Sequence, residues 1–354
     1  MFKTIKNKIK KILLPPDPEL YYGELLGSFS YWRLFLWNLK NPGRLFNRIR
    51  YGQLFKFNSI RKSDFKKKLL VLKENNIISE NYTDNDLLDK FEELLNTGGV
   101  VIQSFFSESK VEKFLEKHKL EVEKIKNFNP TSCAGNNQDD LVISDELINL
   151  WLDPHMIQLI SSFHGKDAIS RYYPSILYTV TKEKLDSRSI YEKKIKTNVA
   201  EFWHADHSVL FNMHILLNDI NESDAHMQYI PGSNKFPNSS NSFSDEVIKK
   251  LGIEPIKCIG KKGTVYMHSG NTLHKLNMEK SKSNRLALHL EFTAGSNILL
   301  DCSVIGKCLS SGFDLNRLNA SQRDILKGIF PKSFPKGYEI NNKEEISPTR
   351  YKGI

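Results

Sequence analysis

A histidine and an aspartate two residues apart are the first candidates for chemistry in this 354-residue chain. His204 and Asp206 stand at the end of a run with the texture of a β-strand. Side chains two apart on a strand point to the same face, so the imidazole and the carboxylate can bind one metal ion together. His274, delivered from a later strand, would complete a set of two histidines and one carboxylate. Such a facial triad leaves coordination positions open and suits Fe(II) in oxygenases.

An arginine eleven residues after His274 is the second candidate. Arg285 begins a run in which apolar side chains alternate with others, which predicts a strand with one apolar face. The apolar set is Leu286, Leu288, Leu290 and Phe292, opposite Arg285, Ala287, His289 and Glu291. A guanidinium that points into the protein needs an anion, because burying an unpaired charge is costly. A dicarboxylate co-substrate would supply one, since carboxylates match the bidentate fork of arginine.

The elements that must position these residues come in two blocks. Before residue 168 we expect helices over 87–95, 107–126 and 144–163, one strand over 100–103, and a loop over 127–140. Short β-rich runs follow at 173–181, 201–217, 227–230, 263–268 and 285–293. Runs of that length between turn clusters predict a sandwich or barrel of antiparallel strands.

Taken together, these residues resemble the phytanoyl-CoA dioxygenase-like branch of the Fe(II)- and 2-oxoglutarate-dependent oxygenases, over roughly residues 88–300. Segment 203–206, Trp-His-Ala-Asp, is similar to the H-x-D motif of that family. Segment 229–234, Tyr-Ile-Pro-Gly-Ser-Asn, resembles its Ile-Pro-Gly-Ser-His turn, and 263–285 resembles its distal histidine and arginine segment. The resemblance implies a mainly β fold with flanking helices: a double-stranded β-helix, or cupin-like jelly roll, with helices on the major sheet and an added helical N-terminal segment.

The resemblance also implies the roles of individual residues. His204, Asp206 and His274 would bind Fe(II), and Arg285 would pair with the far carboxylate of 2-oxoglutarate. His214 either touches 2-oxoglutarate or is a structural histidine, and both readings stay open. The implied enzyme is a dioxygenase that hydroxylates a small-molecule or lipid-linked substrate and releases succinate and CO2. The carboxylate of Asp206 argues against the related halogenases, in which a small residue stands at that position.

Some positions depart from the pattern of the family. Asn234 replaces the histidine of its turn, and Leu276 stands where a small hydroxyl residue is common. These departures affect the expected contacts to the co-substrate and leave the metal triad intact. The remaining histidines of the cluster, at 207, 226, 268 and 289, are most simply exposed or structural, although His289 shares the face of Arg285 and could line the pocket.

Two rival functions remain at this point. One is a catalytically silent metal-binding jelly-roll module that associates with a membrane or a partner. The other is a cupin-like iron or manganese enzyme that does not use 2-oxoglutarate. Arg285 in register with His274 discriminates weakly against both.

The basic charge of the chain is concentrated at its front. The formal net charge of the chain is +10. Residues 1–70 hold 16 Lys+Arg against 4 acidic residues, which gives this segment a net charge of +12. Residues 71–354 therefore carry 35 basic and 37 acidic residues, a net charge of −2. Aromatic residues are interleaved with this charge, and 1–14 has the pattern of a basic amphipathic helix. Three readings compete: a membrane-surface or partner-binding element, helices that pack on the main domain, and nucleic-acid contact, which is the least favoured.

Composition and length bound the remaining expectations. The chain has no apolar run of about 18 residues and no secretory signal at its start, and its four cysteines are scattered. We therefore expect reduced thiols and a cytoplasmic protein, peripheral to a membrane if the front segment binds one. We predict three regions: a basic, aromatic-rich helical extension over 1–85, the dioxygenase domain over 86–308, and a C-terminal extension over 309–354 with one helix at 320–329.

Overall fold

The computed structural model describes ten segments of the chain. They are residues 58–127, 134–136, 141–165, 167–170, 174–179, 203–206, 210–235, 245–250, 252–278 and 284–294. Several predicted features lie outside these segments. They are the basic helix at 1–14, His207, the helix at 320–329 and three of the cysteines, Cys133, Cys302 and Cys308. The fourth, Cys258, is a buried free thiol.

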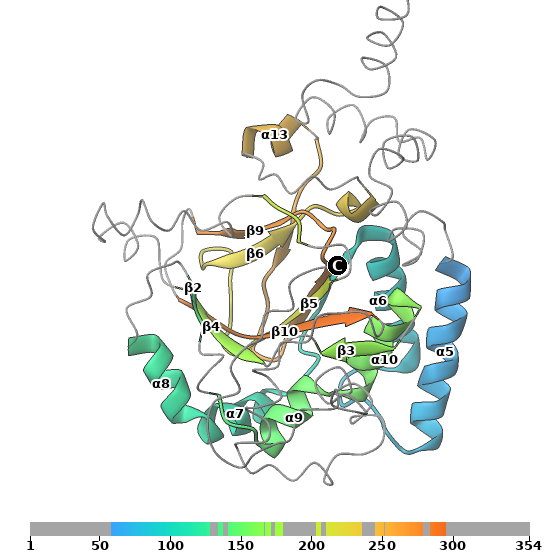
Figure 1. Cartoon of the computed structure of the whole chain (residues 1–354), viewed down its shortest axis with the longest axis horizontal. Helices are drawn as coiled ribbons and strands as arrows, with labels where there is room; N and C mark the ends of the chain where they lie inside the picture. The colour runs from blue at the N-terminus through green and yellow to red at the C-terminus, as the bar shows by residue number, and fades with distance from the viewer. Residues whose placement is uncertain are drawn as a thin grey trace, which may run out of the picture.

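The larger of two antiparallel sheets crosses the middle of the molecule (Figure 1). Six of its seven strands run in the order β1-β8-β5-β10-β4-β2. The seventh, β3, pairs with the C-terminal end of β10. The strands are β1 (Gly99–Ile102), β2 (Ala134–Asn136), β3 (Ala168–Ser170), β4 (Ser175–Thr179), β5 (Leu210–Leu216), β8 (Val265–Ser269) and β10 (Arg285–Ala294). The runs predicted for β4, β5, β8 and β10 are thus confirmed as strands, whereas β2 and β3 were not predicted.

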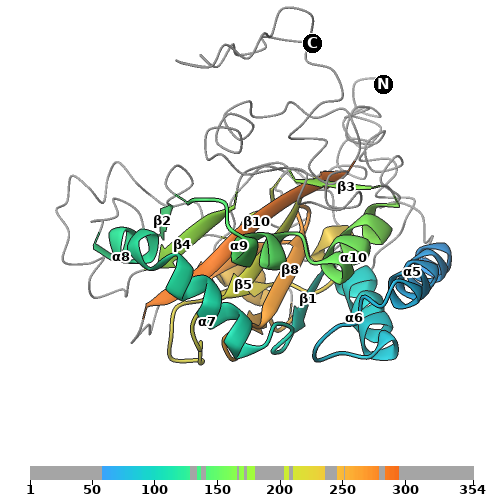
Figure 2. The same ribbon diagram turned by 90° about the horizontal axis from the view of Figure 1, so that it is seen from below.

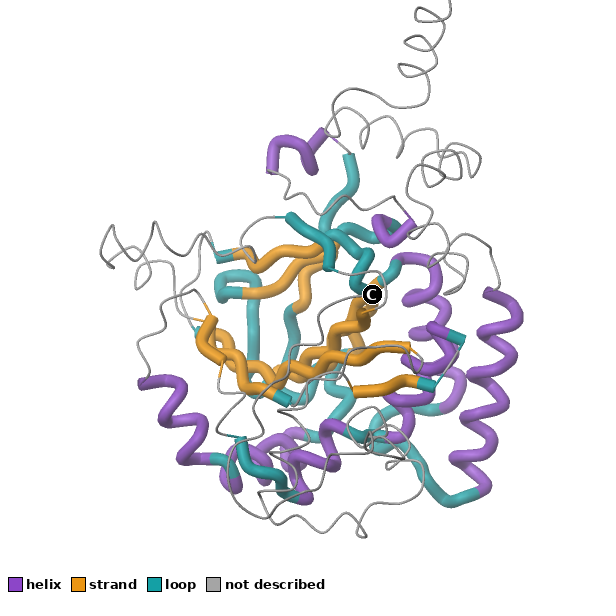
Figure 3. The backbone as a smooth tube through the Cα atoms, viewed as in Figure 1, coloured by secondary structure: helices purple, strands orange, loops and turns teal. Residues whose placement is uncertain are grey.

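The smaller sheet faces the inner side of the larger one (Figure 3). It has the order β7-β6-β9, with β6 (His226–Tyr229), β7 (Ile256–Cys258) and β9 (His274–Asn277). Apolar side chains from both sheets meet between them, among them Leu216 and Tyr266 from the large sheet and Tyr229 and Leu276 from the small one. Two facing antiparallel sheets agree with the predicted double-stranded β-helix.

Helices cover the outer face of the large sheet (Figure 2). They are α6 (Asp84–Thr97), α7 (Glu108–Lys117), α8 (Lys119–Asn127), α9 (Asp145–Trp151) and α10 (Pro154–His164). Helix α5 (Asn58–Glu74) packs on α6 and α10. One more short helix, α13 (Asp245–Lys250), and a 3-10 turn at Ser233–Lys235 lie near the small sheet (Figure 1). None of the described helices is long and apolar enough to cross a membrane.

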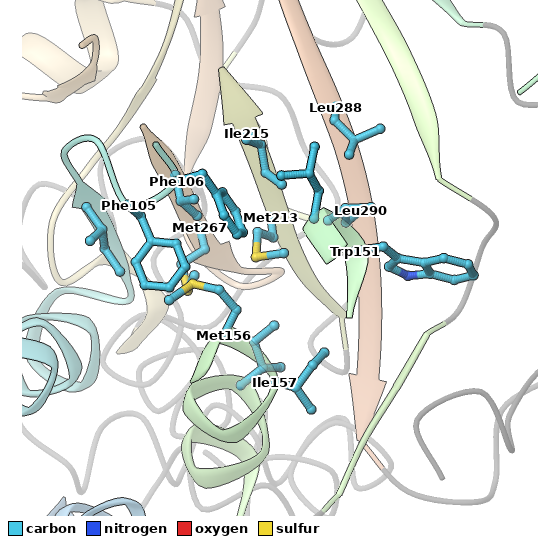
Figure 4. Close-up of a cluster of buried hydrophobic side chains, with 14 of the residues drawn as sticks. Phe105, Phe106, Trp151, Met156, Ile157, Met213, Ile215, Met267, Leu288 and Leu290 are labelled. Atoms are coloured by element: carbon cyan, nitrogen blue, oxygen red, sulfur yellow. The ribbon is translucent and has the colours of Figure 1, made fainter. Parts of the chain in front are cut away.

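The main hydrophobic core lies between these helices and the large sheet (Figure 4). The predicted apolar face of β10 is confirmed, because Leu286, Leu288, Leu290 and Phe292 all belong to this core and are at most 5% exposed. Complete burial of such a side chain stabilises the fold by about 1.5–3 kcal/mol. The alternation therefore places Arg285, His289 and Glu291 of β10 on the other face of the large sheet.

Two predicted helices are each divided in the structure. The helix expected over 144–163 becomes α9 and α10, because Asp153 caps the start of α10 and Pro154 occupies its first position, where a missing N–H costs nothing. The helix expected over 107–126 breaks at His118, whose Nε2 lies 2.8 Å from the hydroxyl of Ser144. Both predictions of a single helix were wrong.

Helix α5 packs on the rest of the fold. Phe65 and Leu69 are buried in the main core, and the Phe65 ring lies 4.6 Å from the ring of Phe91 in α6. For residues 58–74 the structure therefore shows helix packing, which was one of the three readings of the front segment. The division at residue 85 stays a prediction.

Candidate metal and co-substrate site

The three predicted metal ligands come together between the two sheets. One ligand atom from each of His204, Asp206 and His274 lies within 4.8 Å of the others. His274 Nε2 is 3.5 Å from Asp206 Oδ2, and His204 Nε2 is 4.0 Å from Asp206 Oδ1. Two imidazole nitrogens and a carboxylate at these separations fit around a single divalent cation, so the donor set suits Fe(II).

Backbone pairing brings the two histidines together across 70 residues of sequence. His204 and His274 form an antiparallel bridge, in which each backbone N–H donates to the carbonyl of the other at 3.0 and 2.9 Å. Their rings lie 4.3 Å apart. Asp206 follows His204 by two residues in the extended chain, so all three side chains converge on one place.

A turn before β9 fixes the orientation of His274. The Nδ1–H group of His274 donates to the carbonyl oxygen of Thr272 at 2.9 Å, which leaves Nε2 to face the carboxylate of Asp206. The hydroxyl of Thr272 donates in turn to the carbonyl of Gly98 at 2.7 Å. Gly98 has a φ of +79°, and a Cβ there would come within 2.5 Å of Asn234, so the position requires glycine.

The Pro-Gly-Ser turn supports the same histidine from the other side. The hydroxyl of Ser233 accepts the backbone N–H of Leu273 at 2.8 Å and donates to the carbonyl of Ile230 at 2.6 Å. Gly232 closes the turn with a φ of +81°. The motif that the sequence pointed out therefore positions the residue next to His274.

A hydrogen bond from the large sheet holds Asp206. Asn212 on β5 donates from Nδ2 to Asp206 Oδ2 at 2.6 Å. Burial alone would raise the pKa of Asp206, but the neighbouring imidazoles of His274, His268 and His204 and the bond from Asn212 outweigh it and lower that pKa. The carboxylate is thus kept ionised, as metal binding requires.

Arg285 is buried at the other end of this interior and is 2% exposed. It donates to Thr179 Oγ1 at 3.3 Å, to His214 Nδ1 at 3.3 Å and to the hydroxyl of Tyr266. All three partners are neutral groups, and no carboxylate pairs with Arg285 within the described part of the chain. A buried guanidinium without an acidic partner fits an anionic ligand such as a carboxylate of 2-oxoglutarate.

Aromatic rings connect Arg285 with the metal triad. His214 stacks on Tyr266 at 4.5 Å and lies 6.4 Å from His268, whose ring is 4.1 Å from that of His274. Burial lowers the pKa of His214 well below its ordinary value, with further lowering by His289 and Arg285. Burial likewise lowers the pKa of His268 and of His289 to about 4. These imidazoles are therefore neutral at physiological pH.

Several residues of this interior were not predicted as part of the site. Thr179 and Tyr266 accept hydrogen bonds from Arg285 through their hydroxyl groups. Position 276, where the family commonly has a small hydroxyl residue, holds the buried apolar side chain of Leu276. Asn212 holds Asp206. Strand alternation in the sequence could have placed each on the inner face, but the register between distant strands is not readable from one sequence.

A third group holds the outer side of the backbone bridge between His204 and His274. Trp203 precedes His204 and Lys275 follows His274, so both side chains point to the side opposite the two imidazoles. Trp203 Nε1 donates to Asp245 Oδ1 at 2.7 Å, and Lys275 Nζ donates to the same oxygen at 2.5 Å. Lys275 also lies over the Trp203 ring. A pocket of about 290 Å³ opens beside this clamp, lined by Gln228, Lys249 and Glu254 among others.

Residues 95–287, more than half of the chain, match the phytanoyl-CoA dioxygenase (PhyH) family model. The chain belongs to the phytanoyl-CoA dioxygenase family. It is therefore a non-heme iron oxygenase that depends on 2-oxoglutarate, and the predicted family and enzyme class are confirmed.

Several solved structures are similar to this member of the phytanoyl-CoA dioxygenase family at low identity. SnoN, an epimerase from nogalamycin biosynthesis, has 13% identity over 60% of this chain and 84% of its own, with a TM-score of 0.44. EctD from S. alaskensis, solved with 2-oxoglutarate and 5-hydroxyectoine, has 15% identity over 60% and 77%, with a TM-score of 0.45. AviO1 from Streptomyces viridochromogenes Tue57 has 13% identity over 61% and 98%, with a TM-score of 0.46. No curated protein matches the sequence.

Proposed function

We propose that this oxygenase hydroxylates a small-molecule or lipid-linked substrate, and that His204, Asp206 and His274 bind its Fe(II). The observation that carries the proposal is the convergence of these three ligand atoms within 4.8 Å, in the same interior as the buried Arg285. A dicarboxylate fits this arrangement, since one end can reach the metal while the other meets a guanidinium.

The residues of the chain have distinct tasks in this proposal. When bound, Fe(II) and 2-oxoglutarate supply the oxidising chemistry, in which O2 is consumed, succinate and CO2 are released and a C–H bond is hydroxylated. Thr272 fixes the ring of His274, and Asn212 fixes the carboxylate of Asp206. Arg285 pairs with the far carboxylate of 2-oxoglutarate.

The co-substrate end of the site is held in place by neutral groups. Thr179, Tyr266 and His214 orient the guanidinium of Arg285 through hydrogen bonds. His214 acts on 2-oxoglutarate through this contact and through its position beside the rings of Tyr266 and His289. The buried rings around it exclude water from the anion.

The front segment is proposed to deliver the enzyme to a membrane surface or a partner. Its net charge of +12 and its aromatic residues support this, and α5 presents Ile60, Leu70 and Val71 to solvent beside its lysines. In this proposal residues 86–308 form the catalytic unit, and 1–85 and 309–354 are extensions. Deletion of residues 1–57 should weaken binding to vesicles with anionic lipids, and unchanged binding would remove the membrane role.

Substrate-independent turnover tests the catalytic proposal. Purified protein with Fe(II), 2-oxoglutarate and O2 should release succinate slowly even without its substrate. His204→Ala and Asp206→Ala should each abolish this release, because each removes a ligand of the triad. Succinate release at the wild-type rate in either variant would refute the assignment of the site.

A further inference from the structure

Two buried hydrogen-bond acceptors beside the metal triad have no donor within the described part of the chain. They are Asn212 Oδ1 and His268 Nε2. Their side chains are 5% and 3% exposed. Asn212 and His268 are register partners on β5 and β8, so they stand next to each other on the face that is turned away from the helices.

Both atoms are identified as acceptors by the bonds on the opposite side of each group. Asn212 donates a hydrogen bond from Nδ2 to the carboxylate of Asp206, which can only accept. The Oδ1 atom of Asn212 therefore points away from Asp206. His268 Nδ1 lies 3.2 Å from the carbonyl oxygen of Ser269, which also can only accept. The proton is therefore on Nδ1, and Nε2 presents a lone pair.

The pair lies at the metal end of the interior. The His268 ring is 4.1 Å from the ring of His274, and Asn212 bonds the same oxygen of Asp206 that lies 3.5 Å from His274 Nε2. The end near Arg285 offers a cation to an anion, whereas the end near the triad offers acceptors.

We infer that the substrate carries hydroxyl or amino groups next to the carbon that is oxidised and donates them to Asn212 Oδ1 and His268 Nε2. This inference rests on the proposed function and names the class of substrate: a polyhydroxylated or amino-bearing group, whether free or attached to a lipid. A plain hydrocarbon chain at this place would leave both acceptors unpaired in a dry site, which is unfavourable. Sites built to bond a substrate hydroxyl or amine reject the analogue without it by about 10⁴- to 10⁵-fold.

Relaxation by a bound paramagnetic ion tests the inference without turnover. The full-length protein is loaded with Mn(II) and 2-oxoglutarate, and three probes are added in turn: trans-1,2-cyclohexanediol, trans-2-aminocyclohexanol and 1,2-dimethoxycyclohexane. The ether keeps the ring and the oxygens but has no donor. We expect the protons of the diol and the amino alcohol to be relaxed by Mn(II) at least about tenfold more strongly than those of the ether, as for a ligand bound about tenfold more tightly.

Variants connect this preference with the acceptors. His268→Phe keeps a ring but removes the lone pair, and Asn212→Leu removes the oxygen, so each should reduce the preference for donors. His268→Gln restores an acceptor and should retain the preference, which separates hydrogen bonding from packing. Met267→Leu, on the helix side of the same strand, is the control and should leave the preference unchanged.

Three results would overturn the inference: equal relaxation of the ether, no relaxation of either donor, or a preference that survives in both His268→Phe and Asn212→Leu. The protons of 2-oxoglutarate serve as the internal reference. If Mn(II) does not relax them, the proposed function fails. If they are relaxed and the donors are not preferred, only the substrate class fails.

Discussion

Arg285 carries the strongest physical constraint of any single residue in the site. A guanidinium that is 2% exposed and bonded only to neutral groups among the described residues is costly unless an anion completes its surroundings. The bonds from Thr179, His214 and Tyr266 orient the group but do not neutralise it. Retention of such a charge makes sense if the co-substrate supplies the anion.

Replacement of Arg285 should therefore affect 2-oxoglutarate more than iron. In Arg285→Met the concentration of 2-oxoglutarate for half-maximal succinate release should rise by about 10- to 150-fold, the equivalent of a charge-assisted hydrogen bond. Fe(II) affinity, measured by anaerobic titration without 2-oxoglutarate, should change little. An unchanged co-substrate requirement would mean that another residue holds the far carboxylate.

At the scale of elements, short strands place the ligands and a short helix holds them from behind. Asp245 at the start of α13 binds both Trp203 and Lys275, which are the neighbours of His204 and His274. Lys275 has a side chain that is 8% exposed, so its ammonium depends on this partner. The clamp thus ties α13 to the backbone bridge between His204 and His274.

Removal of the clamp should loosen the metal site. In Asp245→Ala, Trp203 and Lys275 lose a shared acceptor, so the free energy of unfolding should fall by about 1–3 kcal/mol. Fe(II) affinity should fall on the order of tenfold, since groups that support metal ligands contribute at that level. Asp245→Asn keeps the acceptor for Trp203 and should lose less. Wild-type stability together with wild-type iron affinity in Asp245→Ala would show that α13 does not support the site.

Helix α10 makes the stability of the fold dependent on pH. His164 is buried against the rings of Phe163 and Phe211, and burial, with a further contribution from Arg61, lowers its pKa to about 3. In the unfolded chain the same group has a pKa near 6.5. Between about pH 6.5 and about 3 the unfolded state binds a proton that the folded state does not, so stability falls as the pH falls.

A variant that cannot titrate should flatten this dependence. In His164→Phe the slope of unfolding free energy against pH below 6.5 should decrease by up to about 1.4 kcal/mol per pH unit. Denaturant unfolding at several pH values between 6.5 and 4.5 measures the slope. An unchanged slope would show that His164 titrates alike in the folded and unfolded states.

The elements were more predictable from the sequence than the contacts between them. The apolar face of β10 follows from alternation alone, and the structure places it in the core as expected. His204, Asp206 and His274 could be grouped because two lie at strand spacing and the third follows a recognisable motif. Thr179 and Tyr266 could not be added to this group from the sequence. Their contacts to Arg285 depend on the register of strands that are 106 residues apart in the case of Thr179 and 19 residues apart in the case of Tyr266.

At the scale of the whole molecule, one core joins the front of the described chain to the catalytic sheets. Helix α5 packs on α6 and α10, and its Phe65 shares a core with strands β5 and β10. The face opposite that core carries exposed Ile60, Leu70 and Val71. The fold thus anchors residues 58–74 while leaving apolar and basic side chains exposed on α5, at the end of the front segment.

Truncation of the anchor should destabilise the whole domain. Phe65→Ala should reduce the free energy of unfolding by about 3–5 kcal/mol, because the ring is completely buried and leaves a cavity. Ile60→Ala on the same helix is the control, because Ile60 is 64% exposed and the change should stay within about 0.5 kcal/mol. Equal effects of the two substitutions in denaturant unfolding would mean that α5 is not part of the cooperative core.

Anaerobic titration with Fe(II) and then 2-oxoglutarate tests the central claim most directly. Chelation of Fe(II) by 2-oxoglutarate in the predicted site should give a weak visible charge-transfer absorption with one equivalent of each per chain. Asp206→Ala should lose this absorption, because one of the three ligands is gone. Iron that binds without producing the absorption, or an absorption that persists unchanged in Asp206→Ala, would contradict the assignment of His204, Asp206 and His274 as the catalytic metal site.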